Sequence, residues 1–333
     1  MNTSDLITVI IPVFNTGPWL APCLESILVQ TWPSLEILVV DDGSTDDSPS
    51  IIRSFQERDP RITVITQTNQ GLSAARNAAL DRAHGDWIMF LDSDDSVADT
   101  FCEHAWLAAA ESGADLVLFD ALGVIEGTGD TFPFRSELPA GVYDKKETLL
   151  ALARFLIPPN AWNKLYRRRL FEQIRFPAGE NWEDCAVMHR IIDRAGQICV
   201  LHDTLYYYRN RTGSITGLAQ QDLSVYSWRY LQYGKRYAYL LEKYPDIARE
   251  MTASQEETAL KYCAACAISP DRQEQFRMMR ARILQGEPDE NGVTIPRNAH
   301  PSPKIRLARI LLRFSPGLFR MAAKRLVNGR QPG

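Results

Sequence analysis

The chain of 333 residues lacks a long apolar run. Its first apolar stretch, residues 6–14, falls short of the roughly 20 residues that a membrane-spanning helix needs, and no basic leader precedes it. The six cysteines are scattered, without the regular spacing of a disulfide framework. Together these absences predict a protein of a reducing compartment, cytoplasmic and without a membrane span.

Two cofactor motifs are incomplete. Cys263 and Cys266 form a single C-x-x-C in an alanine-rich helical stretch. Because no second pair is nearby, we expect them to pack rather than to bind zinc. The segment after the first apolar run, residues 14–18, contains one glycine, whereas a dinucleotide-binding turn needs G-x-G-x-x-G. This difference argues against a dinucleotide-dependent dehydrogenase.

Acidic residues are absent from one region, residues 304–330, which contains eight basic residues. The net charge of the whole chain is only -4, with 37 basic against 41 acidic residues, which argues against a surface built for nucleic acid. Outside this region 29 basic residues accompany the 41 acidic ones. The near-neutral total therefore combines an acidic body with a basic C-terminal region.

Short apolar runs alternate with helical patterns in the first third of the chain. The runs occupy residues 6–14, 35–40, 62–65, 86–91 and 115–119. Strands that are apolar on both faces and separated by helices form parallel sheets. We therefore expect an α/β fold, a Rossmann-like and mostly parallel sheet flanked by helices, with a C-terminal helical extension. Ligands of such sheets bind at the carboxyl ends of the strands.

Carboxylates follow two of these expected strands. Asp41 ends the second run, where it can accept a hydrogen bond from a uracil ring or cap the next helix. Asp92, Asp94 and Asp95 follow the fourth run and repel one another unless a cation is present. Their hard oxygen ligands favour Mg²⁺ or Mn²⁺, and the alternative is an acidic turn before a helix.

The segment between the third and fourth runs adds two candidates. Gly71 allows close backbone approach to a ligand, and Arg76 falls in the first turns of a helix, where it can face a nucleotide. The alternative is an ordinary capped helix with a surface arginine. We expect Gly85 to close this helix as its C-cap.

Several motifs follow one another in a fixed order. They are Pro12-Val-Phe-Asn15, Asp41-Asp-Gly-Ser-x-Asp46, Asn69-x-Gly-x-Ser-x-Ala-Arg-Asn77, Gly85 and Asp92-x-Asp94-Asp95. In this combination they resemble the nucleotide-binding half of family 2 glycosyltransferases of the GT-A fold, over residues 5–120. Three segments extend the resemblance to bacterial capsule and exopolysaccharide members: Trp162-Asn-Lys-Leu-Tyr166, Asn181-Trp-Glu-Asp184 and Tyr206-Tyr-Tyr-Arg-x-Arg-x-Gly-Ser-Ile215.

The resemblance implies a role for each matched residue. Asp184 is implied as the catalytic base that takes a proton from the acceptor hydroxyl, and Asp41 as the partner of uracil. Asp92 and Asp94 would hold a Mg²⁺ or Mn²⁺ ion on the diphosphate. The implied nucleotide-binding residues, besides Asp41, are Pro12, Phe14, Asn15, Gly71, Arg76, Asp92 and Ser93.

Four residues of the second half are candidates for the acceptor site, each with a plainer alternative. Trp162 and Trp182 stack on sugar faces or belong to the core. Glu183 orients the catalytic base or serves as a helix N-terminal acid. Arg209, like Lys164, contacts anionic groups or is a solvated charge.

The resemblance implies an inverting, metal-dependent glycosyltransferase. It would transfer a sugar from a nucleoside-diphosphate donor, UDP-linked, to a hydroxyl of a glycan or lipid-linked glycan in surface or exopolysaccharide synthesis. One alternative is a catalytically silent scaffold that binds sugar nucleotides, although both the metal carboxylates and the base are present. Another is a phosphatase of the haloacid dehalogenase type, whose D-x-D lies on the first strand rather than the fourth.

The same reasoning divides the chain into five segments. We expect a nucleotide-sugar-binding half at 1–120, an acceptor-binding half at 121–217, a helical extension at 218–285, a linker at 286–303 and basic amphipathic helices at 304–330.

The basic C-terminal region has helical periodicity. Arg306, Arg309 and Arg313 fall on one helical face, and after a break at 315–317 apolar and basic residues alternate again. A pair of basic amphipathic helices without acids is typical of an interfacial anchor on anionic lipid, and the alternative is docking onto the acidic body. We therefore expect a peripheral location on the cytoplasmic face of the membrane.

Overall fold

The structure is a computed structural model that describes residues 6–211, 224–288, 294–296 and 301–328. It divides into two compact units, Met1–Thr212 and Gly213–Gly333. The domain boundary expected at 217–218, and the end of the basic region at 329–330, lie outside the described residues. Among the described residues no helix is both long and apolar enough to cross a membrane.

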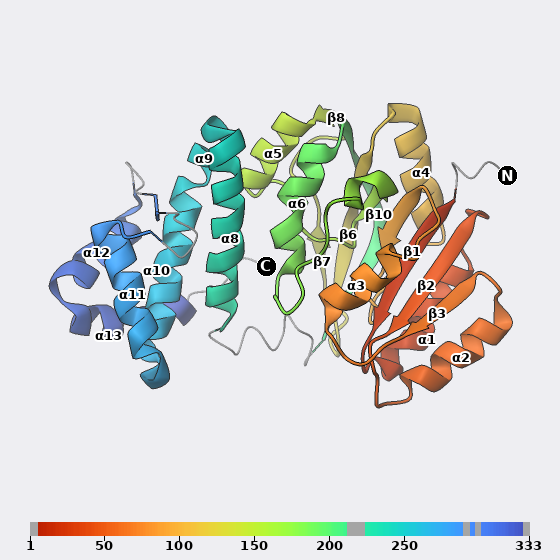
Figure 1. Ribbon diagram of the computed structural model, residues 1–333, viewed down its shortest axis with the longest axis horizontal. Coiled ribbons are helices and arrows are strands. Elements are labelled where there is room, and N and C mark those ends of the chain that lie inside the picture. Colours follow the sequence, from red (N-terminus) through yellow and green to blue (C-terminus); the bar gives the residue numbers. More distant parts are fainter. Residues whose placement is uncertain (1–5, 212–223, 289–293, 297–300, 329–333) are drawn as a thin grey trace. The chain divides into compact units, whose positions relative to one another are not determined.

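The first unit is built on a sheet whose first part is parallel (Figure 1). Four strands pair side by side in the order β3-β2-β1-β4. They are β1 (Ile7–Val13), β2 (Leu35–Asp41), β3 (Ile62–Thr66) and β4 (Trp87–Phe90). Every residue of β1 is buried, as its unbroken apolar run requires at the centre of a covered sheet. The α/β fold expected from the alternating pattern is confirmed.

Beyond β4 the same sheet is mixed. The remaining strands are β5 (Ser96–Val97), β6 (Leu116–Ile125), β7 (Thr131–Phe134), β8 (Gly141–Asp144), β9 (Lys164–Arg167) and β10 (Gln197–Asn210). Strand β10 runs parallel to β6, whereas β9 is antiparallel to both β4 and β6. Strand β7 returns antiparallel to β6 because the turn between them is too short for a crossover.

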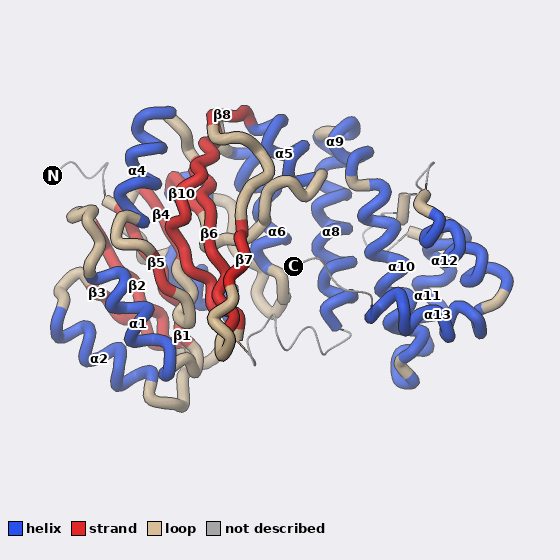
Figure 2. Tube along the Cα trace, turned by 180° about the vertical axis from the view of Figure 1, so that it is seen from behind, coloured by secondary structure: helices blue, strands red, loops and turns tan. Residues whose placement is uncertain are grey.

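Helices cover both faces of this sheet. Helices α1 (Gly17–Leu28), α2 (Ser48–Arg58) and α4 (Phe101–Ser112) lie over one face, where their apolar residues share a core with Val9, Ile37 and Val117 (Figure 2). Figure 1 shows α3 (Leu72–Leu80), α5 (Lys145–Ala153) and α6 (Glu183–Arg194) on the opposite face. A short 3-10 helix, η2, spans Arg168–Phe171.

The loop after α3 corrects one expectation. Helix α3 ends at Leu80, and Gly85 is not its C-cap. A Cβ atom at Gly85 would lie 2.7 Å from the carbonyl oxygen of Leu6 and 2.7 Å from Oγ1 of Thr8. Glycine is therefore required here because the loop passes directly against β1.

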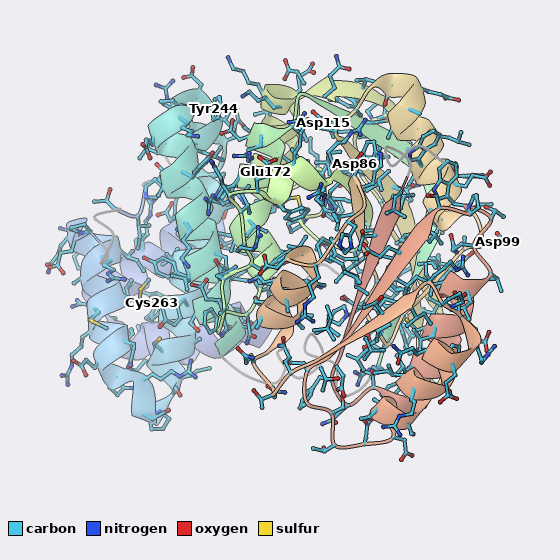
Figure 3. All side chains as sticks on the ribbon, turned by 45° about the vertical axis from the view of Figure 1, so that its right-hand side comes forward. Asp86, Asp99, Asp115, Glu172, Tyr244 and Cys263 are labelled. Carbon is cyan, nitrogen blue, oxygen red and sulfur yellow. The ribbon has the colours of Figure 1, made fainter. Side chains whose placement is uncertain are left out.

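The second unit is helical. Its helices are α8 (Ser224–Lys243), α9 (Pro245–Glu250), α10 (Thr252–Ile268), η3 (Pro270–Arg272), α11 (Gln273–Gln285), α12 (Pro303–Phe314) and α13 (Pro316–Asn328). Cys263, labelled in Figure 3, and Cys266 are fully buried on α10, so both sulfurs belong to the helical core. Helices α12 and α13 pack against α10 and each other.

Candidate functional site

The carboxyl ends of β2 and β4 flank that of β1, and polar side chains gather there. Asp41 is the last residue of β2 and is only 6% exposed. One of its oxygens, Oδ1, accepts a hydrogen bond from the Ser44 amide at 2.9 Å. The sequence therefore places Asp41 correctly at the strand end, inside the turn that follows.

The loop after β1 adds two exposed groups. Asn15 has a positive φ of 52° and its Oδ1 accepts a hydrogen bond from the Thr45 amide at 2.8 Å, which ties this loop to the β2 turn. The Phe14 ring is 46% exposed beside it. Pro12, in contrast, is buried within β1 opposite Val40, so it supports the loop rather than lining an open surface.

Asp42 is a functional candidate that we did not select from the sequence. Its side chain is buried, with Oδ1 accepting from the Gln70 amide at 2.9 Å and Oδ2 from the Gly71 amide at 2.8 Å. Gly71 has a φ of 87°, and a Cβ atom there would meet nothing within 4 Å. Glycine is thus needed for its backbone conformation. The only sequence signal for Asp42 was its place in the Asp41-Asp42 pair.

Arg76 connects the two halves of the site. Its side chain is 2% exposed, donating from one terminal nitrogen to Glu183 Oε1 at 2.5 Å and from the other to Asp92 Oδ1 at 2.8 Å. The rings of Phe90 and Phe176 lie 5.6 Å and 5.4 Å from the guanidinium carbon. The alternative of a surface arginine is wrong, because Arg76 is an internal bridge from α3 to the end of β4 and the start of α6.

The three carboxylates of the turn after β4 differ in burial and in hydrogen bonding. Asp95 is 3% exposed and accepts hydrogen bonds from the Tyr206 hydroxyl at 2.6 Å and the Arg209 amide at 2.7 Å. Ser93 accepts a hydrogen bond from the Thr16 hydroxyl at 2.9 Å. These contacts fix the turn from inside. Asp92 and Asp94 are more exposed, at 25% and 20% of their side chains.

The two more exposed carboxylates suit a hard divalent cation. Burial, together with the nearby Asp92 charge, raises the pKa of Asp94, which indicates a conflict that a bound cation would relieve. Arg211 donates to Asp94 Oδ2 at 2.8 Å. No group of three or more His, Cys, Asp or Glu side chains that could hold a metal occurs in the described ranges. A cation here would therefore draw its other ligands from water and substrate phosphate, as Mg²⁺ commonly does.

Asp184 lies in the first turn of α6, beside Glu183. Its Oδ1 accepts a hydrogen bond from the Cys185 amide at 2.7 Å. Burial raises the pKa of Asp184, and the positive charges of Arg76 and Lys164 oppose this shift.

Lys164 lies beneath this helix start, at the first position of β9. It is fully buried, and its Nζ donates to the carbonyl oxygens of Pro158 and Asn160 at 3.0 Å and 2.5 Å and to Asn163 Oδ1 at 2.7 Å. Burial lowers the pKa of Lys164 to about 7, and the Asp184 charge opposes the shift. Neither of the two roles considered from the sequence, anion contact or solvated charge, is correct.

Replacing Lys164 with methionine is expected to lower the free energy of unfolding by at least about 2 kcal/mol, because three oxygen acceptors would stay buried without their donor. Lys145→Met is the matched control, since that side chain is 42% exposed and its ion pair with Asp193 contributes about 1 kcal/mol or less. Urea unfolding of both variants measures the difference. Equal stabilities would contradict the structural role of Lys164.

The residues expected in the acceptor site differ in how deeply they are buried. Trp162 is 5% exposed and its ring stacks on Tyr206 at 4.5 Å and on Tyr208 at 5.8 Å, so the acceptor assignment is wrong and it belongs to the core. Arg209 donates from Nε to the Asp94 carbonyl at 3.1 Å, which makes it part of the β4 turn. Trp182 is partly exposed, with a positive φ of 62° at the N-cap of α6.

Comparison with known proteins agrees with this geometry. Residues 8–195 match the model of the glycosyl transferase family 2. The chain is 36% identical over 224 residues to glycosyltransferase GlyA of Streptococcus pneumoniae, covering 65% of this chain and 32% of that protein. It is 34% identical to glycosyltransferase GlyG of the same species, covering 64% and 73% of the two chains.

Solved structures share the fold. The crystal structure of S. aureus TarS 1-349 in complex with UDP-GlcNAc has a TM-score of 0.73 at 20% identity, covering 98% of this chain and 93% of that one. The mannosyltransferase PcManGT from Pyrobaculum calidifontis, in complex with GDP-Man and Mn²⁺, has a TM-score of 0.52 at 18% identity, covering 98% and 88%. The family model spans more than half of the sequence, and the chain belongs to glycosyltransferase family 2.

Proposed function

We propose that this chain transfers a sugar from a UDP-linked donor to a hydroxyl group of a glycan or lipid-linked glycan, with inversion at the anomeric carbon. One observation carries the proposal: the Arg76 bridge holds the start of α6, with Asp184, beside the Asp92 carboxylate at the end of β4. A base and a diphosphate-binding turn are thus fixed close together. The TarS fold, solved with UDP-GlcNAc, supports a nucleotide-sugar donor.

In the proposed reaction each of these groups has one role. Phe14 and Asn15 bind the base and ribose at the end of β1, and Asp41 accepts a hydrogen bond from uracil. Asp184 accepts the proton of the acceptor hydroxyl while the oxygen of that hydroxyl attacks the anomeric carbon. The new C–O bond forms as the bond to the diphosphate breaks on the opposite face, and UDP leaves. A Mg²⁺ or Mn²⁺ ion held by Asp92 and Asp94 would offset the charge that develops on the leaving diphosphate.

The segments keep the roles inferred from the sequence. Residues 1–120 bind the donor and 121–217 the acceptor; 218–285 form a helical extension, 286–303 a linker, and the basic region 304–330 serves attachment. Trp182 and Glu183, at the start of α6, stay candidates for acceptor contact. Synthesis of a surface or exopolysaccharide, at the cytoplasmic face of the membrane, is supported by the motif resemblance and by the basic helices.

A screen of UDP-sugars for slow hydrolysis with Mn²⁺ or Mg²⁺, with GDP-mannose for comparison, tests this function. We expect release of UDP from at least one UDP-sugar and a loss of activity in EDTA. Asp94→Ala should abolish the metal-dependent rate, whereas Asp130→Ala, at an exposed site remote in sequence from the turn, should not. Full activity in EDTA would contradict the proposed metal dependence. Binding of a UDP-sugar without any turnover would favour the catalytically silent scaffold. Release of phosphate from a phosphomonoester would favour the phosphatase.

A further inference from the structure

Helices α12 and α13 have one face that packs inside the second unit. Ile305, Ala308 and Leu312 of α12, with Phe319 and Ala323 of α13, are at most 8% exposed. The Arg280 side chain donates to the Leu312 carbonyl at 3.0 Å, and the Arg309 guanidinium pairs with the buried Glu256 carboxylate of α10. This face of α12 and α13 thus docks onto the protein, as the alternative to a lipid anchor expects, against α10 and α11 of the same unit.

The opposite face carries large apolar side chains. We call them the outer stripe: Leu307, Ile310, Phe314, Leu318 and Met321, exposed by 56%, 54%, 75%, 53% and 75%. Within α12, Leu307, Ile310 and Phe314 are three or four residues apart and so share one side of that helix, as Leu318 and Met321 do within α13. A docked helix usually exposes its polar side. Each of these two helices is therefore apolar on two opposite faces, of which the described part of the second unit covers one.

Basic residues border the outer stripe. Lys304, Arg306 and Arg313 of α12 are exposed, whereas the Arg320 side chain of α13 donates to Gln273 Oε1 at 2.6 Å and lies over the Phe276 ring of α11. No acidic residue occurs between 301 and 328. Clustered apolar exposure of this kind marks an interaction site, and the charge that surrounds it selects the partner. A partner that fits must offer both a negative surface and an apolar interior.

We propose that the outer stripe inserts into the interfacial region of an anionic lipid bilayer, with its bordering arginines and lysine on the lipid headgroups. An amphipathic helix pair binds such a surface through buried apolar area and attraction to anionic lipids. The proposal deepens the peripheral location proposed above by naming the surface responsible. It does not depend on glycosyl transfer, because lipid binding is measured without donor or acceptor.

Co-sedimentation with phosphatidylcholine vesicles, with and without phosphatidylglycerol, tests the proposal on the full chain. We expect binding to the anionic vesicles only, weakened at high salt. The variant Leu307→Ser, Ile310→Ser, Phe314→Ser should bind at least about tenfold less tightly. The matched control Val29→Ser, Leu107→Ser, Leu241→Ser changes three exposed apolar residues elsewhere and should bind as the parent does.

A second variant tests the charge. Lys304→Gln, Arg306→Gln, Arg313→Gln should also bind at least about tenfold less tightly, whereas Arg53→Gln, Arg82→Gln, Arg190→Gln, at exposed sites elsewhere, should not. Unchanged circular dichroism shows that each variant is folded. Equal vesicle binding by the outer-stripe variant would overturn the proposal. So would a dimer, detected by light scattering and lost in that variant, without vesicle binding, because a second copy would then cover the outer stripe.

Discussion

Replacing Asp184 with asparagine is expected to reduce turnover by about 10²- to 10⁴-fold, the usual contribution of a positioned general base. Binding of UDP should persist, because the residues proposed to hold the nucleotide lie at the ends of β1, β2 and β4 rather than on α6. Asparagine keeps the shape of the side chain and can still accept the hydrogen bond from the Cys185 amide. Steady-state rates with the donor found in the screen, and UDP titration, measure the two effects.

The pH dependence of the parent enzyme gives a second readout for the same residue. A base acts only when deprotonated, and burial raises the pKa of Asp184. Turnover should therefore fall with decreasing pH at a value above the ordinary aspartate pKa of about 3.9. The control is Asp203→Asn, at a half-exposed carboxylate paired with His104, which should leave rate and profile unchanged. Parental turnover in Asp184→Asn would remove this residue from the base role.

Replacing Arg76 with methionine is expected to destabilise the first unit by about 3–5 kcal/mol, because the Asp92 and Glu183 carboxylates would lose a shared, buried partner. Turnover should fall as well, since the start of α6 would no longer be tied to the end of β4. Lysine should not rescue the variant, because a single ammonium lacks the fork that serves two carboxylates. Urea unfolding and donor hydrolysis measure both effects.

The matched control for this prediction is Arg58→Met. Arg58 also pairs with a glutamate, Glu25, at 2.8 Å, but the two side chains are 52% and 50% exposed. Such a surface pair contributes about 0–1 kcal/mol. If Arg76→Met also lowers the free energy of unfolding by less than about 1 kcal/mol, the internal bridge stabilises the protein no more than a surface pair does. That result would contradict its proposed role.

The parallel sheet of the nucleotide half and its strand-end carboxylates follow from the sequence, whereas the strand order comes from the structure. The runs around β1, β2 and β4 are apolar on both faces apart from Thr8 in β1 and Glu36 and Asp41 in β2, a pattern typical of covered parallel strands. Because parallel strands end at the same edge, Asp41 and Asp92 lie at the same edge of the sheet, on either side of β1. The mixed second half gave no comparable pattern, since short antiparallel returns such as β7 are partly exposed.

Burial and partners at the site were decided by tertiary structure alone. Arg76 and Glu183 are 107 positions apart, and no local pattern distinguishes an arginine that turns inward from one that faces water. The same holds for Trp162, whose stacking partners lie on β10, and for Lys164, which is fully buried beside the Asp184 charge of α6.

The basic C-terminal helices show the same division between sequence and structure. Periodicity and the absence of acids predicted two amphipathic helices from the sequence alone. A helix with apolar residues on two opposite sides, however, leaves open which side the protein covers. The packing of Leu312 and Phe319 inside the helical unit settled this and left Phe314 and Met321 exposed. Local chemistry thus determined which groups the chain carries, and long-range packing determined which of them face solvent, because burial depends on neighbours distant in sequence.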